Sequence, residues 1–344
     1  MQVRIAVNIQ ASGGRASRSV DVGLSESYGS FTRHLVGSRA TDMMRILISG
    51  GSGLAGKALV RVLRAEGHSV ARLVRPGNVP SAGDIAWDPI ARTIDVSAME
   101  AADAVVHLSG ASIAHGRWTP ARKAVLRSSR IDTTRVLVDA LTRLQQKPRV
   151  FVSASAIGCY GDRGDEILTE SSGNGTDFLS LLVRDWEGEA IRAEASGIRT
   201  VLLRFGVILS GEGGALPQML SPFKFGLGGR LGSGKQWMSW IALEDAVGIV
   251  CSAITNKDLA GPVNVVAPSP LRNADFTRIA AAVLHRPAIF VAPAFALRIA
   301  LGEMADALLL ASQRVIPERL LAMGYSFRLP EFESALRSIT ARNS

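Results

Sequence analysis

The sequence predicts an α/β protein with a Rossmann-type doubly wound parallel sheet and a smaller C-terminal α+β substrate lobe. Two observations lead to this fold class. From residue 44 onward, short apolar runs alternate with segments of helical periodicity, which is the pattern of βαβ units. The first apolar run also ends directly in a glycine-rich turn at Gly50, Gly53 and Gly56.

The expected elements follow one another with short connections. Strands are predicted at residues 45–48, 68–74, 104–108, 149–155 and 199–203, and helices at residues 54–65, 119–144 and 176–195. Apolar strands that alternate with helices indicate a parallel sheet covered on both faces. Gly67 and Gly197 are expected to end two of the helices.

The chain divides into three predicted parts. Residues 1–43 carry clusters of Ser, Gly and Arg without periodicity, and we interpret them as a disordered extension or as a start placed too early. Residues 44–209 form the predicted NADP-binding Rossmann domain, to which a strand and a helix return from residues 241–266. Residues 210–344 form the substrate lobe and a C-terminal helical domain, beginning with a glycine-rich loop at 210–236.

Composition narrows the function classes. The chain of 344 residues has a net charge of +9, but its basic residues are scattered, so we expect a solvated basic surface and no nucleic-acid partner. No apolar run reaches the roughly 18–20 residues of a membrane span, so no membrane partner is expected. The two cysteines give no disulfide framework, which favours a cytoplasmic location. A small-molecule substrate is expected, and a homodimer is compatible with the sequence.

The glycine-rich turn predicts a dinucleotide site. Gly50, Gly53 and Gly56 stand between a strand and a helix, with Leu54 as the first helical residue. Glycine permits a tight turn and lets backbone N–H groups approach a pyrophosphate, which the helix dipole also stabilises. The alternative is a glycine-rich turn without a ligand.

The end of the second strand favours NADP(H) over NAD(H). NAD sites place an acidic residue there to bond the ribose 2′-hydroxyl, whereas this chain has Arg75, whose guanidinium suits a 2′-phosphate. Leu108, Ser109 and Gly110 end the third predicted strand and should lie along the cofactor. Arg130, on the helix that follows, is expected to reach a phosphate, although a solvated basic face is the alternative.

Together these motifs resemble the extended short-chain dehydrogenase/reductase superfamily, and within it an atypical, epimerase-like branch with its own C-terminal domain. The resemblance covers about residues 44–340 and rests on segments 48–56, 108–113, 117–118, 129–134, 153–161, 186–187, 228–229 and 236–245. It implies a Rossmann core, NADP(H) binding and an oxidoreductase or epimerase role. Members of this branch mostly lack an established substrate.

The chain departs from the superfamily at its catalytic pair. Typical members use Tyr-x-x-x-Lys, in which the Lys lowers the pKa of the Tyr. None of the three tyrosines has a Lys four residues later, and by position Trp186 replaces the Lys and Leu182 the Tyr. Ser155 matches the serine that assists the Tyr. We therefore predict Ser155 and Tyr160 as catalytic residues, with hydrogen-bonding wall residues as the alternative.

The predicted function is an NADP(H)-dependent oxidoreductase or epimerase acting on a small substrate. The alternative is a non-catalytic NADP(H)-binding protein that senses redox state or regulates a partner. The histidines and cysteines show no metal-ligand spacing, so no metal is expected. Aromatic residues of the substrate lobe are expected to line a pocket, namely Phe223, Phe225, Trp237 and Trp240.

Overall fold

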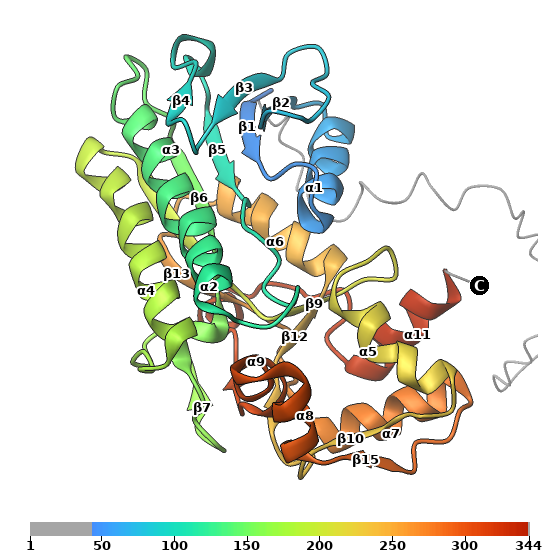
Figure 1. Cartoon of the computed structure of the whole chain (residues 1–344). Helices are drawn as coiled ribbons and strands as arrows, with labels where there is room; N and C mark the ends of the chain where they lie inside the picture. Colours follow the sequence, from blue (N-terminus) through green and yellow to red (C-terminus); the bar gives the residue numbers. More distant parts are fainter. Residues whose placement is uncertain (1–42, 343–344) are drawn as a thin grey trace, which may run out of the picture. The chain divides into compact units, whose positions relative to one another are not determined.

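The structure is a computed structural model that describes residues 43–342. It confirms the predicted parallel sheet (Figure 1). The eight strands are β1 (Arg45–Ser49), β2 (Ser69–Val74), β3 (Ile85–Asp88), β4 (Thr93–Ile94), β5 (Ala104–His107), β6 (Val150–Ala156), β8 (Arg199–Phe205) and β13 (Gly261–Val265). Their order is β13-β8-β6-β5-β1-β2-β3-β4, and every neighbouring pair is parallel except β3 with β4. The interpretation of residues 1–42 lies outside the described residues.

Helices cover both faces of the sheet because its central strands are apolar on both sides. Ile46 and Ile48 of β1 pack with α1 and α6 on one face, and Leu47 packs with α3 on the other. All three side chains are fully buried. The helices are α1 (Leu54–Ala65), α2 (Pro120–Arg127), α3 (Thr133–Leu141), α4 (Phe178–Ile191) and α6 (Leu243–Thr255).

The strand order places a crevice beside the glycine-rich turn. From β1 the chain builds outward to β2, β3 and β4 in one direction, and then from β5 to β6 and β8 in the other. In such sheets the connections diverge where the order reverses, and ligands bind outside the carboxyl ends of the strands at that point. A ligand site is therefore expected at the carboxyl ends of β1 and β5.

The predicted helix at 119–144 is wrong in one respect, because it is not continuous. A π-helical turn at Ser128–Asp132 separates α2 from α3. Hydroxyl groups supply bonds to the carbonyls there: Thr133 donates to Ser129 O at 2.8 Å, and Thr134 donates to Arg130 O at 2.6 Å. Such side-chain bonds, invisible to a hydrophobic pattern, accompany a local change in helix pitch.

The C-terminal lobe has its own core, in which the Trp240 ring lies 5.2 Å from Phe332 and Phe276 lies 5.4 Å from Phe332. Its elements are β9 (Val207–Leu209), α5 (Ala215–Lys224), β10 (Gly229–Leu231), β11 (Trp237–Met238), β12 (Trp240–Ala242), β14 (Leu271–Arg272), α7 (Asn273–Leu284), β15 (Phe290–Ala292), α8 (Ala294–Leu301), α9 (Glu303–Ala305), β16 (Arg314–Val315), α10 (Glu318–Ala322) and α11 (Phe332–Ala341).

The glycine-rich segment at 210–236 is not one long loop, as the sequence suggested, because α5 lies within it. Leu216, Leu220 and Phe223 share one face of α5 and are buried in the core of the lobe. The high glycine content around the helix and Pro222 within it obscure this spacing in the sequence.

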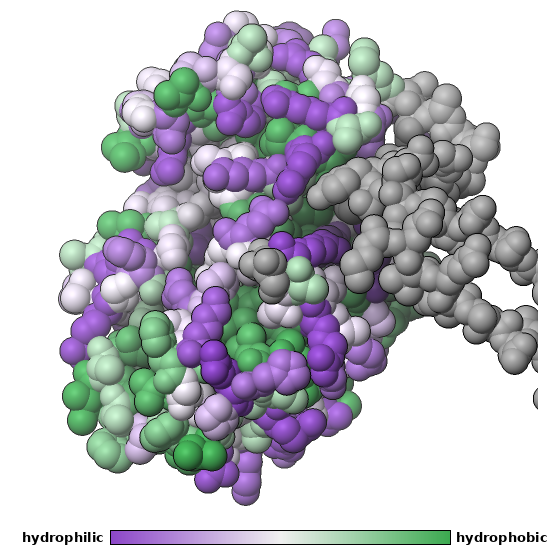
Figure 2. Space-filling model, turned by 90° about the vertical axis from the view of Figure 1, so that its right-hand side faces the viewer, coloured by the Kyte–Doolittle hydropathy of each residue, from purple (hydrophilic) through white to green (hydrophobic). Residues whose placement is uncertain are grey.

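The lobe also presents apolar side chains to solvent. Figure 2 shows hydrophobic residues on the lower part of one face, where Figure 1 places this lobe. The exposed apolar residues of the lobe between α5 and α8 are Phe225, Leu227, Ile289, Phe290, Val291, Phe295 and Ile299. Across residues 43–342, no helix combines the length and apolar character needed to cross a membrane.

Candidate functional site

The glycine-rich turn lies tightly against the end of β5. Gly50 has a φ of +75°, and a Cβ atom added to it would lie 2.6 Å from the carbonyl of Leu108. A Cβ on Gly56 would lie 2.2 Å from the carbonyl oxygen of Gly50. Both contacts are to backbone, which cannot give way as a flexible side chain can. The turn thus leaves its backbone bare at the point where the strand order reverses.

Helix α1 begins at Leu54, directly over this turn. Its N-cap residue, Gly53, donates its N–H to Gly50 O at 3.0 Å and has no side chain to cap the first helical turn. The N-terminal N–H groups and the positive end of the helix dipole therefore favour an anion at the crevice.

Beside the turn, at the end of β2, lie two arginines with different surroundings. Arg72 packs its side chain on Gly51 and bonds Asp84 through Nε at 3.1 Å. Burial opposes ionisation of Asp84, but its bonds from Arg72 and Ser81 lower its pKa below the usual range. Arg75 is exposed. The acid nearest this strand end is thus already neutralised by Arg72, which the sequence separation of the two residues did not reveal.

Arg130 lies over the end of β5. Its guanidinium carbon is 3.4 Å from the position of a Cβ on Gly110, and it stands 5.4 Å above the ring of Trp186. It donates to the carbonyls of Ala111 at 3.0 Å and Leu126 at 3.3 Å. Within residues 43–342, no carboxylate is paired with it.

The surroundings of Arg130 disfavour its charge. Burial, with a smaller contribution from Arg122, lowers the pKa of Arg130 to about 10. Arg122 donates to the carbonyl of Ser112, and its Nε is buried without a hydrogen-bond partner among the described residues. Two neighbouring guanidinium groups without a paired acid between them would be stabilised by an anion.

Ser155 lies at the end of β6 and is 3% exposed. Its hydroxyl donates to Glu187 at 2.5 Å, and Glu187 is held by Arg204 through two bonds of 2.9 Å. Burial opposes the charge on Arg204, but its bonds to Glu187 hold the pKa of the guanidinium above its ordinary value. A carboxylate that accepts the Ser155 proton is thus kept in place by a buried cation.

Tyr160 belongs to the same network but lies deeper, with no exposed surface. Its hydroxyl accepts from Arg204 at 3.0 Å and donates to Asn264 at 2.7 Å. Burial raises the pKa of the Tyr160 phenol to about 12. The structure therefore links Ser155 and Tyr160 through Glu187 and Arg204, and the one proton of the Tyr160 hydroxyl is donated to Asn264.

The structure brings most of the predicted site residues together at neighbouring strand ends. The residues gathered at the ends of β1 and β5 are Gly50, Gly53, Leu54, Gly56, Leu108, Ser109, Gly110 and Arg130. Arg75 follows β2 on one side, and Ser155 ends β6 on the other. Sequence reasoning missed Arg204 and Asn264, although an Arg within the apolar run of β8 was a signal for a buried partner.

The aromatic residues expected to line a substrate pocket divide into two groups. Phe223 and Trp240 are buried in the core of the lobe, whereas Phe225 is 77% exposed. Two guanidinium groups lie over the Trp237 ring, that of Arg272 at 4.7 Å and that of Arg314 at 4.4 Å. Of the four aromatics, Trp237 alone is held at an intermediate burial among cations.

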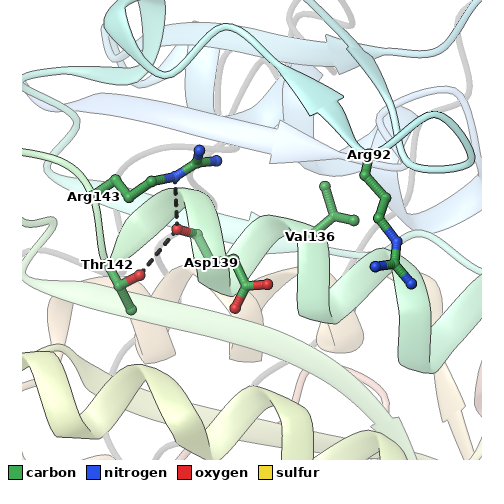
Figure 3. Close-up of a pocket in the computed structure, with 5 residues that line it drawn as sticks. All are labelled: Arg92, Val136, Asp139, Thr142 and Arg143. Atoms are coloured by element: carbon green, nitrogen blue, oxygen red, sulfur yellow. Dashed lines mark hydrogen bonds between the residues drawn. The ribbon is translucent and has the colours of Figure 1, made fainter.

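A hollow of about 380 Å³ lies elsewhere, at the C-terminal turn of α3 (Figure 3). It is lined by Arg92, Val136, Asp139, Thr142 and Arg143. The side chains of Thr142 and Arg143 both donate to the carbonyl of Asp139, which gives this carbonyl of the last helical turn its hydrogen-bond partners. Because α3 runs antiparallel to the strands, this hollow is at the opposite edge of the sheet from the glycine-rich turn. Among residues 43–342, no group of three or more His, Cys, Asp or Glu side chains could hold a metal ion.

A parallel sheet with a glycine turn at its switch point defines a dinucleotide-binding protein of the Rossmann type. Comparison with known families agrees with this class. Residues 46–266 match the NAD dependent epimerase/dehydratase family, and residues 292–339 match a domain of unknown function, DUF1731. The chain belongs to the NAD dependent epimerase/dehydratase family, which confirms the predicted branch with its own C-terminal domain.

Relatives extend over nearly the whole described chain. An epimerase family protein of Mycobacterium leprae is 41% identical over 89% of this chain and 99% of its own length. Human epimerase family protein SDR39U1 is 37% identical over 87% of this chain and 100% of its own length.

Two solved structures show the same fold at similar identity. Human SDR39U1 in complex with NADPH has a TM-score of 0.79 and 36% identity, covering 87% of this chain and 99% of that one. A nucleoside-diphosphate sugar epimerase from Corynebacterium glutamicum has a TM-score of 0.72 and 36% identity, covering 86% of this chain and 58% of that one.

Proposed function

We propose that this protein binds NADP(H) at the ends of β1, β2 and β5 and acts as an oxidoreductase or epimerase on a small molecule. The observation that carries the proposal is the Arg130 guanidinium, held over Gly110 beside the bare glycine turn without a carboxylate partner in the described chain. The two phosphates of the cofactor fit this place, because they provide the negative charge that would pair with Arg130. They also accept hydrogen bonds from the N–H groups at the start of α1. NADPH bound to the human relative supports the assignment.

The preference for NADP(H) rests on the end of β2. Arg75 is exposed and available to pair with a 2′-phosphate, whereas Arg72 is engaged by Asp84. Asp84 would repel a 2′-phosphate if it were free, but its carboxylate accepts from both Arg72 and the Ser81 N–H. Neutralising this acid removes the feature by which NAD sites exclude the additional phosphate.

Bound NADP(H) supplies or accepts a hydride. The chain must then move a proton, and we assign this transfer to Ser155 with Glu187, whose side chains are hydrogen-bonded at 2.5 Å. In the oxidising direction, Ser155 accepts the proton of a substrate hydroxyl as it passes its own to Glu187, and reduction runs the same path in reverse. Arg204 stays bonded to Glu187 throughout and holds its position.

Ser155 and Tyr160 enter this proposal with different roles. The catalytic role predicted for Ser155 is retained, since its hydroxyl lies at a strand end. The catalytic role of Tyr160 stays a prediction, and its burial favours a positioning role in which the phenol holds Arg204. Replacing Tyr160 by Phe should then alter turnover through Arg204 and leave NADPH binding intact.

Measuring NADPH affinity tests the cofactor assignment. Arg130→Met should raise the Kd for NADPH about 10-fold or more, because it removes a charge-assisted bond. Arg127→Met is the matched control, since Arg127 is exposed on the preceding turn and pairs with Asp185. Equal affinities of the two variants would remove Arg130 from the site.

A second function, non-catalytic NADP(H) binding for regulation or redox sensing, is favoured by one observation. The phenol of Tyr160 is buried and bonded on both sides, so it is not poised for a substrate. A panel of carbonyl compounds and nucleoside-diphosphate sugars, followed by NADPH absorbance and by product analysis, separates the two. Turnover that Ser155→Ala abolishes supports the enzyme, and tight NADPH binding without turnover supports the alternative.

We also propose a cytoplasmic location and a homodimer. Both Cys159 and Cys251 are free thiols, which suits a reducing compartment. The exposed apolar side chains of the C-terminal lobe support self-association, because patches of this kind mark protein interfaces. Light scattering should give a dimer mass that Phe295→Asp reduces to that of a monomer. A monomer in both cases would contradict the dimer.

A further inference from the structure

A fully buried histidine joins the glycine-rich turn to the helical layer. His107, the last residue of β5, lies 2.5 Å through Nδ1 from the Ser49 hydroxyl and 3.0 Å through Nε2 from the Thr134 hydroxyl. Ser49 is the residue directly before Gly50, and Thr134 lies in α3. The ring is flanked by Phe151, at 6.4 Å, and Trp87, at 6.3 Å.

The partners of Thr134 determine where the protons lie. The Thr134 hydroxyl donates to Arg130 O at 2.6 Å, so its one proton is used. It therefore accepts from the indole N–H of Trp186, at 2.9 Å, and from Nε2–H of His107. Nδ1 of His107 is then the bare nitrogen, and it accepts from the Ser49 hydroxyl. One neutral tautomer satisfies all four groups.

The two ends of this chain of bonds reach the proposed phosphate ligands. Ser49 also accepts Leu108 N–H at 3.0 Å through its carbonyl, so the start of the glycine turn is tied to β5 twice. At the other end, Thr134 holds the carbonyl of Arg130, and the Trp186 ring lies beneath the Arg130 guanidinium at 5.4 Å. Trp186 thus packs its ring against the guanidinium of Arg130 and donates its indole N–H to the hydroxyl of Thr134.

We propose that Ser49, His107, Thr134 and Trp186 form a buried hydrogen-bond relay that holds the glycine turn and Arg130 in register for the phosphates of the cofactor. His107 and Thr134 are positioning residues in this relay. The inference rests on the proposed cofactor binding. It also gives the Trp that stands at the position of the usual Lys a definite task, which is to orient a phosphate ligand.

Variants that break the relay at its centre test this role. Thr134→Val keeps the shape of the side chain but leaves the N–H groups of His107 and Trp186 without an acceptor. We expect it to raise the Kd for NADPH about 10-fold or more. Thr200→Val is the matched control, because Thr200 is equally buried but its hydroxyl bonds only the carbonyl of Ile198 among the described residues, away from the turn. Its Kd should stay near that of the wild type.

A rescue series separates positioning from general stability. His107→Leu should weaken NADPH binding as Thr134→Val does, and His107→Gln should recover affinity because its amide offers both an N–H donor and a carbonyl acceptor. Folded Thr134→Val and His107→Leu variants that bind NADPH with wild-type affinity would overturn the relay. Equal loss in Thr200→Val would also overturn it, since the effect would then be one of stability alone.

The tautomer provides a readout that needs no variant. In 15N spectra of the histidine-labelled wild-type protein, His107 should carry its proton on Nε2 with a bare Nδ1 at neutral pH. A proton on Nδ1, or on both nitrogens, would overturn the relay even where substituted chains fail to fold. Failure of the wild type to bind NADPH while His107 shows the expected tautomer would instead locate the error in the proposed function.

Discussion

The guanidinium of Arg204 makes two parallel bonds of 2.9 Å to the carboxylate of Glu187, and both side chains are buried. The pair joins β8 to α4 directly behind Ser155. Bidentate pairs of this kind are geometrically specific, but each partner depends on the other for its charge to be tolerated.

Removing one charge of the pair should be costly. Glu187→Gln leaves Arg204 buried without a counter-charge and should lower the free energy of unfolding by about 3–5 kcal/mol, measured by urea denaturation. The exposed pair of Arg337 with Glu333 is the control, and Glu333→Gln should cost less than about 1 kcal/mol. Similar losses of unfolding free energy for the two substitutions would mean that the buried charge of Arg204 does not depend on the charge of Glu187.

The third glycine of the turn should not tolerate a side chain. Gly56→Ala places a Cβ where the carbonyl oxygen of Gly50 lies 2.2 Å away, so the turn must shift. We expect lower thermal stability and loss of measurable NADPH binding in a fluorescence titration. Gly188→Ala is the control, because Gly188 is exposed within α4 with open space around it. That substitution should stabilise the protein by about 0.5–1 kcal/mol.

The arginine at the end of β2 should set the choice of cofactor. Arg75→Ala should weaken NADPH binding about 10–100-fold and leave NADH binding unchanged, because only NADPH carries the 2′-phosphate. Calorimetric titration with both cofactors measures this. Arg149→Ala is the control and should change neither affinity, because Arg149 directly precedes β6, at the amino ends of the strands and away from the glycine-rich turn. An NADPH affinity that survives Arg75→Ala would place the 2′-phosphate elsewhere.

His107 should make the fold sensitive to acid. Burial lowers the pKa of His107 to about 3, against an ordinary value of 6.5. Between these two pH values the unfolded chain binds a proton on His107 and the folded protein does not. The stability that the neutral ring contributes is therefore fully present above pH 6.5 and is lost as pH falls toward 3. The expected slope approaches about 1.4 kcal/mol per pH unit as the pH falls below about 5.5. His107→Gln should flatten this slope in urea titrations, whereas His115→Gln, an exposed control, should keep it.

Local sequence determined the βαβ unit well. The predicted helix at 54–65 has the bounds of α1, and the predicted strands at 45–48 and 68–74 differ from β1 and β2 by one residue. Their periodicity and the glycines between them act over a few residues, which is the range a sequence pattern reports. The short strands β3 and β4 were not predicted, because four residues and two residues carry too little periodicity.

The chemistry around the turn depended on contacts distant in sequence. The sequence by itself determined a glycine cradle for a dinucleotide, a cation after β2 and the absence of a Tyr-x-x-x-Lys pair. Only the tertiary structure decided that Asp84 is neutralised by Arg72, that Glu187 is held by Arg204 behind Ser155, and that Arg130 faces Gly110 without an acid in the described chain. The physical reason is that the energy of a buried charge depends on which groups surround it, and that is set by packing between elements far apart in the chain.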